Sequence, residues 1–591
     1  MEKSGTNAAC GDAPNVRAMG FNQLFAKTAS ALALVAAAAC APADDNGAGL
    51  DPSNPGAGLT STVSDVPTPN EASRFLTQAS FGPSAADIDQ LTSTGMSEWI
   101  EDQAAAAPSF YLPRLVAREL AGDELDDDAA SDIFWENAVN ARDQLRQRVA
   151  FALSQIVVVS ESSGSPVNDN PRMLAYYMDI LSRGALGNYR DILEEVTYSP
   201  AMAEYLTYMR NRKADPDSGR VPDENYAREI LQLFTIGLVD LLPNGEPDPA
   251  GGETYDNEDV VGLAKVFTGL ALSGGFRERD ADDDAEFSRL VAYPEEHSTE
   301  EKSFLGLTIP ANTGPEASIT MALDHIFAHP NVGPFVCRQL IQRLVKSDPS
   351  PAYVQRVAET FDRGSFTLLD GDVVGDGRRG DMTATVAAIL LDEEARQDPG
   401  LGTDVDGKVR EPVLRFLHWA RAFNVASAVA AEDRFLGDMG RPDRLSQHPF
   451  RSPSVFNFYR PRYIAPSSET GAAGVTAPEL QLVNETSAIG YVNIMGRYIR
   501  DDTPTQNDGD GSAFRPNYEA EIALADDPAA LVERLDLLMT SGLMNQQTKD
   551  RIITVLNEVE IRDDRADEDR ETRVHLAVLM AVTAPSYLVT R

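Results

Sequence analysis

The residues best suited to acid–base chemistry gather in the segment DENYARE. Asn225 and Glu229 stand four apart in it, so both fall on one face of the predicted helix. Glu224 and Arg228 are also four apart, in the order that favours an ion pair along a helix. A carboxylate beside an amide could orient a water, a metal ion or a sugar hydroxyl. The alternative interpretation is a buried hydrogen-bond network that joins this helix to its neighbours and performs no reaction.

Two further side chains with chemical capacity, His297 and Lys302, fall in a predicted loop. His297 and Lys302 are each a potential acid, base or anion ligand, since an imidazole changes its charge near neutral pH. In an exported hydrolase or lyase that acts on a polymer such as a glycan, we expect Glu224 and Glu229 to be the acid/base residues. The residues that would position the substrate are Asn225, Arg228, His297 and Lys302.

Two aspartate-rich loops are candidate sites for a divalent cation such as calcium. Alternating carboxylates around a glycine turn present the oxygen ligands that hard cations prefer. The closing glutamate of an EF-hand is absent from the first loop, and the alternative in both places is an exposed turn built from Asp, Pro and Gly. The candidate ligands are Asp215 and Asp217 in KADPDSGR, and Asp370, Asp372 and Asp376 in the second loop.

The sequence motifs of several other common enzyme classes are absent or incomplete in this sequence. The chain has only 6 histidines, and HIFAH at 325–329 lacks the glutamate of a zinc-peptidase helix. Neither a nucleophile elbow nor a Walker-type phosphate loop occurs. GDGRRG at 375–380 matches a dinucleotide-binding fingerprint, but no parallel βαβ pattern surrounds it. Because Asp381 at the next helix start would also repel a pyrophosphate, we expect a tight loop there.

Net charge excludes one class of partner. The 92 acidic and 51 basic residues give a formal net charge of −41, and such a surface repels phosphate backbones. We therefore expect no nucleic-acid partner. Hydrophobic residues make up 42% of the 591 positions and are spread along the chain. This composition is typical of a globular protein with one large core or two to three smaller ones.

Helices are the elements that must position the candidate residues. Leu145, Val149 and Leu153 repeat at helical spacing. Asp223 and Asp381 are each placed to cap the helix that follows. The predicted core face of the helix after Asp223 consists of Tyr226, Ile230, Leu233, Phe234 and Gly237.

Strand-like alternation is confined to short pieces, such as 365–374 around a DGD turn. The predicted fold class is therefore mainly α, a large multi-helical globular body with a few short β-hairpins after a disordered N-terminal tether. Cys337 lies on an apolar helix face, so we expect it to be a small core residue and not a nucleophile.

The N-terminal segment predicts export. The apolar run at 28–39 is too short to span a bilayer but suits a signal-peptide core, and it ends directly at Cys40. The sequence AAAC resembles a lipobox, so we expect a signal peptide at 1–39, with Met19 as an alternative start, and a lipid on Cys40. The alternative is ordinary secretion with cleavage near Ala39.

A flexible linker is expected between the lipid and the body. The segment from 40 to 68 is rich in Gly, Pro, Asp and Ser and shows no hydrophobic period. The helical body, of one or two subdomains, would then occupy 69–591. We expect a membrane-anchored lipoprotein of the cell envelope that faces the periplasm or the exterior.

A series of long motifs runs through the body in a fixed order. The motifs are ASRFLTQASFGPS at 72–84, LRQRVAFALSQIVVVS at 145–160, NYRDILEEVTYSPAMAEYL at 188–206, NRKADPDSGRVPDENYAREILQLFTIGL at 211–238, HS and EKSFLG within 297–306, HPNVGPFVCRQLIQRLV at 329–345, GRRGDMTATVAAILLDEEAR at 377–396 and FRSPSVFNFYRPRY at 450–463. Together they resemble the bacterial family catalogued as domain-of-unknown-function family 1800, over roughly residues 70–591.

This resemblance implies a mostly helical exported protein, often encoded beside a phosphatase-like exported family, and it implies no reaction. Three hypotheses follow. The first is an envelope scaffold or binding protein that works with another exported protein. The second is the glycan hydrolase or lyase outlined above. The third is a metal-binding structural protein with the aspartate loops as ligands.

Overall fold

The computed structural model describes residues 63–591, except for 123, 163, 166, 278–280, 283, 398–406, 426–435, 437 and 501–514. The predicted signal peptide, Cys40 and most of the linker lie outside the described residues.

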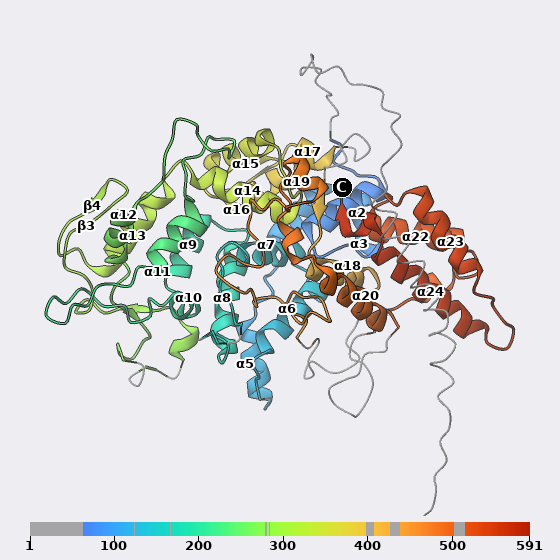
Figure 1. Ribbon diagram of the computed structural model, residues 1–591, viewed down its shortest axis with the longest axis horizontal. Coiled ribbons are helices and arrows are strands. Elements are labelled where there is room, and N and C mark those ends of the chain that lie inside the picture. Colours follow the sequence, from blue (N-terminus) through green and yellow to red (C-terminus); the bar gives the residue numbers. More distant parts are fainter. Residues whose placement is uncertain are drawn as a thin grey trace, which may run out of the picture. The chain divides into compact units, whose positions relative to one another are not determined.

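Helices dominate the described body, so the predicted mainly α class is confirmed (Figure 1). The first helix begins with a capping box. Thr68 accepts a hydrogen bond from the backbone N–H of Glu71, and the Glu71 carboxylate accepts one from the N–H of Thr68. These reciprocal bonds satisfy donors that the first helical turn leaves free. The N-terminal helices are α2 (Pro69–Ala79), α3 (Ala85–Thr94), α4 (Met96–Ala105), α5 (Leu112–Ala121), α6 (Ala129–Asn140), α7 (Gln144–Ser154), α8 (Pro171–Gly184), α9 (Tyr189–Thr197) and α10 (Pro200–Tyr205).

The central part of the chain contains the predicted acid–base segment and the predicted cap at Asp381. That cap is confirmed, because the Asp381 carboxylate accepts from the backbone N–H of Ala384 at 2.8 Å. The central helices are α11 (Asn225–Glu229), the π-helix η1 (Ile230–Thr235), α12 (Asn257–Ala264), the 3₁₀ turn η3 (Ala285–Phe287), α13 (Pro315–Phe327), α14 (Val332–Leu344), α15 (Pro351–Arg363), α16 (Met382–Leu391), α17 (Glu393–Arg396) and α18 (Pro412–Ala422).

Helices α22, α23 and α24 form one end of the body in Figure 1, where α22 packs against both α23 and α24. At the other end, α12 packs against the β3–β4 hairpin, and α7, α8 and α14 lie between the two ends. The last helices are α19 (Glu469–Ala473), the 3₁₀ turn η5 (Pro478–Leu482), α20 (Glu485–Ile499), α21 (Glu519–Ile522), α22 (Pro528–Thr540), α23 (Gln546–Asn557), α24 (Ala566–Val582) and α25 (Pro585–Leu588).

The described strands form short antiparallel pairs. The predicted strand pieces around the DGD turn do pair with each other, as β5 and β6. The last pair was not predicted, because its strands lie far apart in the sequence. It joins Lys408–Val409 to Val589–Thr590. The strands are β1 (Leu270–Ala271), β2 (Val291–Ala292), β3 (Lys302–Phe304), β4 (Leu307–Ile309), β5 (Phe366–Thr367), β6 (Val373–Val374), β7 (Lys408–Val409) and β8 (Val589–Thr590).

The predicted core faces are mostly confirmed. Leu145, Val149 and Leu153 are buried in α7, and Cys337 is fully buried in α14. The exception is Leu233, which is half-buried, whereas its neighbour Leu231 is completely covered. The cause is the π-helix, whose wider turn displaces the face that a regular α-helical spacing predicts. No described helix has the length and apolar character that crossing a membrane requires.

Candidate functional site

A short α-helix followed by a π-helix positions Glu229. Helix α11 begins one residue later than the predicted cap suggests, but the Asp223 carboxylate still accepts from the backbone N–H of Asn225 at 2.8 Å. Glu229 is the last residue of α11, directly before the wider π turn, where the Thr235 hydroxyl donates to the carbonyl of Ile230. Isolated π segments within helices occur often at functional sites.

The carboxyl group of Glu229 is buried and incompletely paired. The residue is 8% exposed, and its Oε2 has no hydrogen-bond partner among the residues that the structure describes. Burial raises the pKa of this carboxyl, and the positive charge of Arg228 opposes the shift. Glu229 therefore keeps its proton to a higher pH than an exposed glutamate does.

Half-buried polar and aromatic side chains surround this carboxyl. Burial, together with the negative charge of Glu229, raises the pKa of Tyr205 to about 12. Burial also raises the pKa of Tyr255, whose hydroxyl donates to Oε1 of Gln232 at 3.3 Å. Both phenols therefore stay protonated and can donate hydrogen bonds at neutral pH. We call this group the Glu229 centre, and its members are Tyr205, Arg228, Glu229, Gln232 and Tyr255.

The other predicted residues of this segment lie beside the centre. The predicted ion pair is present, with Arg228 Nη2 3.3 Å from Glu224 Oε2. Asn225 is half-buried, and its side-chain amide makes a long contact of 3.5 Å with the Thr207 hydroxyl. Arg228 is thus held by Glu224 while its charge acts on Glu229.

His297 and Lys302 form a second group, for which no contact with the Glu229 centre is found among the described residues. His297 is 2% exposed, and its Nδ1 lies 2.8 Å from the carbonyl oxygen of Thr268. Burial lowers the pKa of this imidazole, which is therefore neutral and donates from Nδ1. Lys302 is fully covered, its Nζ donates to the Glu300 carbonyl at 3.3 Å, and burial lowers its pKa.

The first aspartate loop forms an exposed turn. The Asp215 carboxylate accepts from the Ser218 hydroxyl at 2.6 Å and from the backbone N–H of Asp217 at 3.1 Å. The Ser218 hydrogen bond is the main reason why the pKa of Asp215 is lowered. Residue Asp217 is exposed, and Asp215 pairs with Arg220 through an antiparallel bridge. This geometry agrees with the alternative of a turn stabilised by its own side chains.

The second loop gains a third carboxylate from a distant helix. Glu101 of α4 joins Asp370 and Asp372, and one oxygen from each lies within 4.8 Å of the others. Burial raises the pKa of Glu101, followed by the charges of Asp372 and Asp370. The predicted ligand Asp376 lies apart and pairs with Arg378 at 2.7 Å. Because exposed acidic groups gather readily on a chain of net charge −41, the trio alone does not define a metal centre.

A shallow hollow of about 390 Å³ opens between α5 and α6. Its lining includes Phe110, Arg114, Glu136 and Asn137, and the Arg114 guanidinium is paired with Glu136 and donates to the Asn137 side chain. The two opposite charges neutralise each other there. This hollow offers room for a ligand, whereas the Glu229 centre offers a group for proton transfer.

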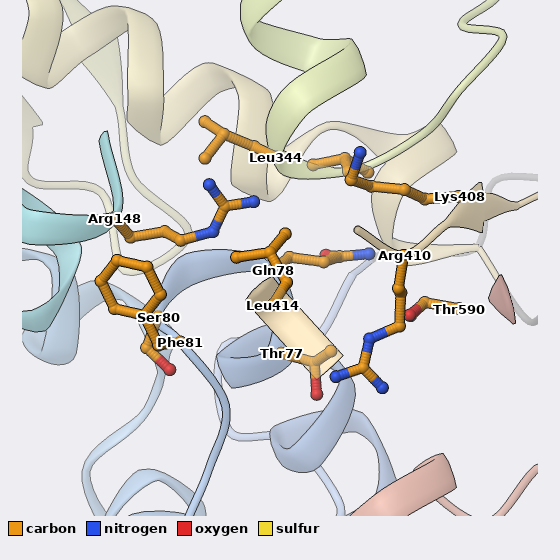
Figure 2. A pocket seen from close by; sticks show the side chains of 11 residues that line it. Thr77, Gln78, Ser80, Phe81, Arg148, Leu344, Lys408, Arg410, Leu414 and Thr590 are labelled. Carbon is orange, nitrogen blue, oxygen red and sulfur yellow. The ribbon is translucent and has the colours of Figure 1, made fainter. Parts of the chain in front are cut away.

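An interior cavity lies between α2, α7 and β7 (Figure 2). Its lining contains none of the catalytic or metal-binding residues that were predicted from the sequence. Its lining includes three cationic side chains and no carboxylate. The cations are Arg148, Lys408 and Arg410.

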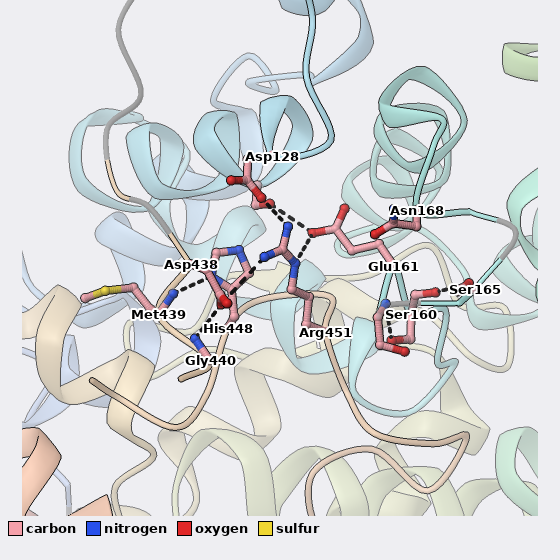
Figure 3. A network of polar contacts seen from close by, with 12 residues as sticks. Asp128, Ser160, Glu161, Ser165, Asn168, Asp438, Met439, Gly440, His448 and Arg451 are labelled. Atoms are coloured by element: carbon pink, nitrogen blue, oxygen red, sulfur yellow. Dashed lines mark hydrogen bonds and ion pairs between the residues drawn. The ribbon is translucent and has the colours of Figure 1, made fainter. Parts of the chain in front are cut away.

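A partly buried polar network around Arg451 was also missed (Figure 3). The guanidinium of Arg451 lies 3.1 Å from Glu161 and 3.5 Å from Asp438, and it pairs closely with Asp128. Burial raises the pKa of Glu161 to about 8, against the opposing charge of Arg451. In the same network, His448 Nδ1 accepts from the backbone N–H of Met439 at 3.1 Å.

A sequence signal for this network did exist. The motif at 450–463 contains Arg451, and the motif at 145–160 ends just before Glu161. The periodicity of the sequence could not pair them, because the two motifs are about 290 residues apart.

Comparison with known proteins gives one match. The family model described as a protein of unknown function, DUF1800, matches residues 74–589. No curated protein matches the chain, and no solved structure does.

Proposed function

The chain belongs to the DUF1800 family of proteins of unknown function. Since the family name gives no reaction, we propose a function from the residues themselves: an exported cell-envelope enzyme, a hydrolase or lyase that acts on a glycan polymer. The proposal extends the second hypothesis from the sequence and gives the acid–base role to Glu229. Its position in the envelope is supported by the apolar run at 28–39 followed by Cys40.

One observation carries the proposal. The buried Oε2 of Glu229 has no partner within the described part of the chain, and burial raises the pKa of its carboxyl. An unpaired buried acceptor costs stability. Asp143 and Glu411 also have an unpaired buried oxygen, and Glu229 differs from them in the half-buried tyrosines beside it. A carboxyl whose pKa is displaced toward neutral pH is suited to donate a proton to a substrate.

The surroundings of Glu229 favour a neutral, hydroxyl-rich substrate. Tyr205, Tyr255 and Gln232 offer aromatic faces, phenol donors and an amide, all of which suit sugar rings and their hydroxyls. The formal net charge of −41 would repel an anionic polymer. We therefore infer that an uncharged glycan is the preferred substrate class.

The reaction would begin with proton donation. Glu229 in its neutral form gives its proton to the bridging oxygen of the glycosidic bond as the carbon–oxygen bond breaks. In a hydrolase, Glu224 accepts a proton from the water that attacks the sugar carbon, and exchange with solvent restores both carboxyls. A lyase would have to remove a ring proton that an adjacent carboxyl group makes acidic, and an uncharged glycan lacks that group, so hydrolysis is the reaction that this substrate class favours. Arg228, paired with Glu224, stabilises the negative charge that forms on Glu229.

The test is incubation of the full chain with uncharged glycans from cell envelopes, followed by measurement of new reducing ends. New reducing ends together with the ultraviolet absorbance of an unsaturated ring identify a lyase. New reducing ends without this absorbance identify a hydrolase. We expect Glu229→Gln to lower the rate by roughly 10²- to 10⁴-fold. The matched control is Glu253→Gln, an exposed glutamate of the same region, which should retain the rate. Glycan binding without cleavage by the wild-type chain would contradict the enzyme and favour the scaffold or binding hypothesis.

A further inference from the structure

The interior cavity of Figure 2 is small and enclosed by elements from distant parts of the sequence. It measures about 10 Å³, which is room for a single guest of about the size of a water molecule. Gln78 and Ser80 approach it from α2 and the residues that follow, and Thr590 of β8 approaches from the end of the chain. Figure 2 shows Arg148 on one side, with Lys408 and Arg410 on the opposite side.

Two of the three cations in this lining already have partners. Lys408 forms an ion pair with Glu479, and its Nζ donates to the Gln342 carbonyl at 2.7 Å. The guanidinium of Arg410 donates to the carbonyl of Tyr587 at 3.2 Å and contacts the His418 ring nitrogen. The partners of both cations lie outside the lining of the cavity.

Arg148 differs from Lys408 and Arg410 because two of its guanidinium nitrogens lack a hydrogen-bond partner among the described residues. It is 1% exposed, and its Nη2 donates to the backbone carbonyl of Arg343. Its Nε and Nη1 have no acceptor in the described part of the molecule. Burial lowers the pKa of this guanidinium to about 10, so Arg148 still carries its charge at neutral pH. A buried cation with unpaired donors requires a compensating anion or acceptor.

The carboxylate of Glu411 favours the charged form of Arg148 but makes no hydrogen bond to it, and its own Oε1 has no partner among the described residues. Glu411 is fully covered, and its Oε2 accepts from the side-chain amides of Gln155 and Gln447, each at 2.6 Å. The region also contains Arg343, Arg410 and Arg415, which are all buried, so positive charge remains in excess there.

We propose that this cavity is a binding site for a small monovalent anion, with chloride as its occupant and Arg148 as its principal ligand. A halide accepts hydrogen bonds from Nε and Nη1 and brings no protons that would need acceptors of their own. A water molecule would direct two protons into a lining that already carries three cations. Because the cavity admits one small guest, sulfate and phosphate are excluded by size. The bound ion holds α7, α2 and β7 together in one place.

The test is thermal unfolding of the full chain in sodium chloride and in sodium gluconate at equal ionic strength, which keeps charge screening constant. We expect Tm to be higher in chloride and in bromide than in gluconate. Above the Kd, each tenfold increase in free chloride should raise the folding equilibrium constant tenfold. Equal unfolding temperatures in chloride and gluconate would overturn the proposal.

The variant pair Arg148→Gln and Arg573→Gln locates the effect. Arg573 is 9% exposed, and all three of its guanidinium nitrogens donate to backbone carbonyls. We expect both substitutions to lower Tm, but only Arg148→Gln to abolish the chloride dependence. A chloride dependence that persists in Arg148→Gln would refute the role of this residue.

Crystals of the wild-type chain provide a measurement that does not depend on the folding of a variant. After a bromide soak, an anomalous peak beside Arg148 Nη1 supports the site. Water density without an anomalous signal at that position, or bromide peaks elsewhere only, would overturn it.

Discussion

Replacement of Glu229 by glutamine separates the two roles that this carboxyl can have, proton donor or structural partner. Burial raises its pKa, so the folded protein binds the proton more tightly than the unfolded chain does. The stability that comes from this group is fully present below its unfolded pKa of about 4.3 and is lost as pH rises through the folded pKa. The wild-type protein should therefore lose stability at neutral and alkaline pH because of Glu229.

Glutamine keeps the shape of the side chain and removes the charge. We expect Glu229→Gln to be more stable than the wild type at pH 8 by about 1 kcal/mol, the lower end of the cost of leaving a buried acceptor unpaired. In a chain of this size the gain corresponds to roughly 1–2 °C in Tm. The difference in the free energy of unfolding between Glu229→Gln and the wild type should be smaller at pH 5. This pH is still above the sequence pI of about 4.4.

The assay is denaturant unfolding at pH 5, 6.5 and 8 beside the glycan-cleavage rate. Glu161→Gln is the control, since Glu161 is similarly buried but accepts from the Ser131 hydroxyl at 3.0 Å and pairs with Arg451. That variant should keep the glycan-cleavage rate per folded molecule. A Glu229→Gln protein that is less stable at every pH would refute the argument and place the carboxyl in a structural network instead.

Three further outcomes are expected. Arg451→Met should lower the free energy of unfolding by about 3 kcal/mol, measured with denaturant, because it leaves buried Glu161 without its ion pair. Glu101→Gln removes the repulsion between Glu101 and the charges of Asp370 and Asp372, so it should raise the unfolding free energy in metal-free buffer. The gain should be only a few tenths of a kcal/mol, because solvent screens this repulsion. Should calcium stabilise the wild type but not this variant, the trio is a metal site. Gly237→Ala should lower Tm, with a cost of about 2 kcal/mol, because Gly237 has φ 72° and an added Cβ would meet the Phe335 ring at 2.8 Å.

The local parts of the fold were predictable from the sequence. Asp381 caps its helix, Leu145, Val149 and Leu153 are buried on one face, and Cys337 lies in the core. Each of these depends on interactions within a few residues or on a 3.6-residue period, both of which the sequence displays directly.

The π-helix was not predictable in this way. Its hydrogen bonds depend on how Ile230–Thr235 packs against other helices, and its effect is that Leu231, and not Leu233, is fully covered. The candidate centre was therefore identified by its residue types, while the partners Tyr205 and Tyr255 came from segments that no local pattern connects to Glu229.

The most informative residues of this chain are buried charges whose pairing is incomplete. On an acidic surface a single carboxylate carries little information, but burial without a partner has a free-energy cost that folding alone does not explain. Glu229 has this property beside half-buried tyrosines. Arg148 has it beside a small interior cavity. The proposed roles differ because the side chains around the two groups differ in exposure: we propose proton transfer to a substrate for Glu229 and a bound anion for Arg148.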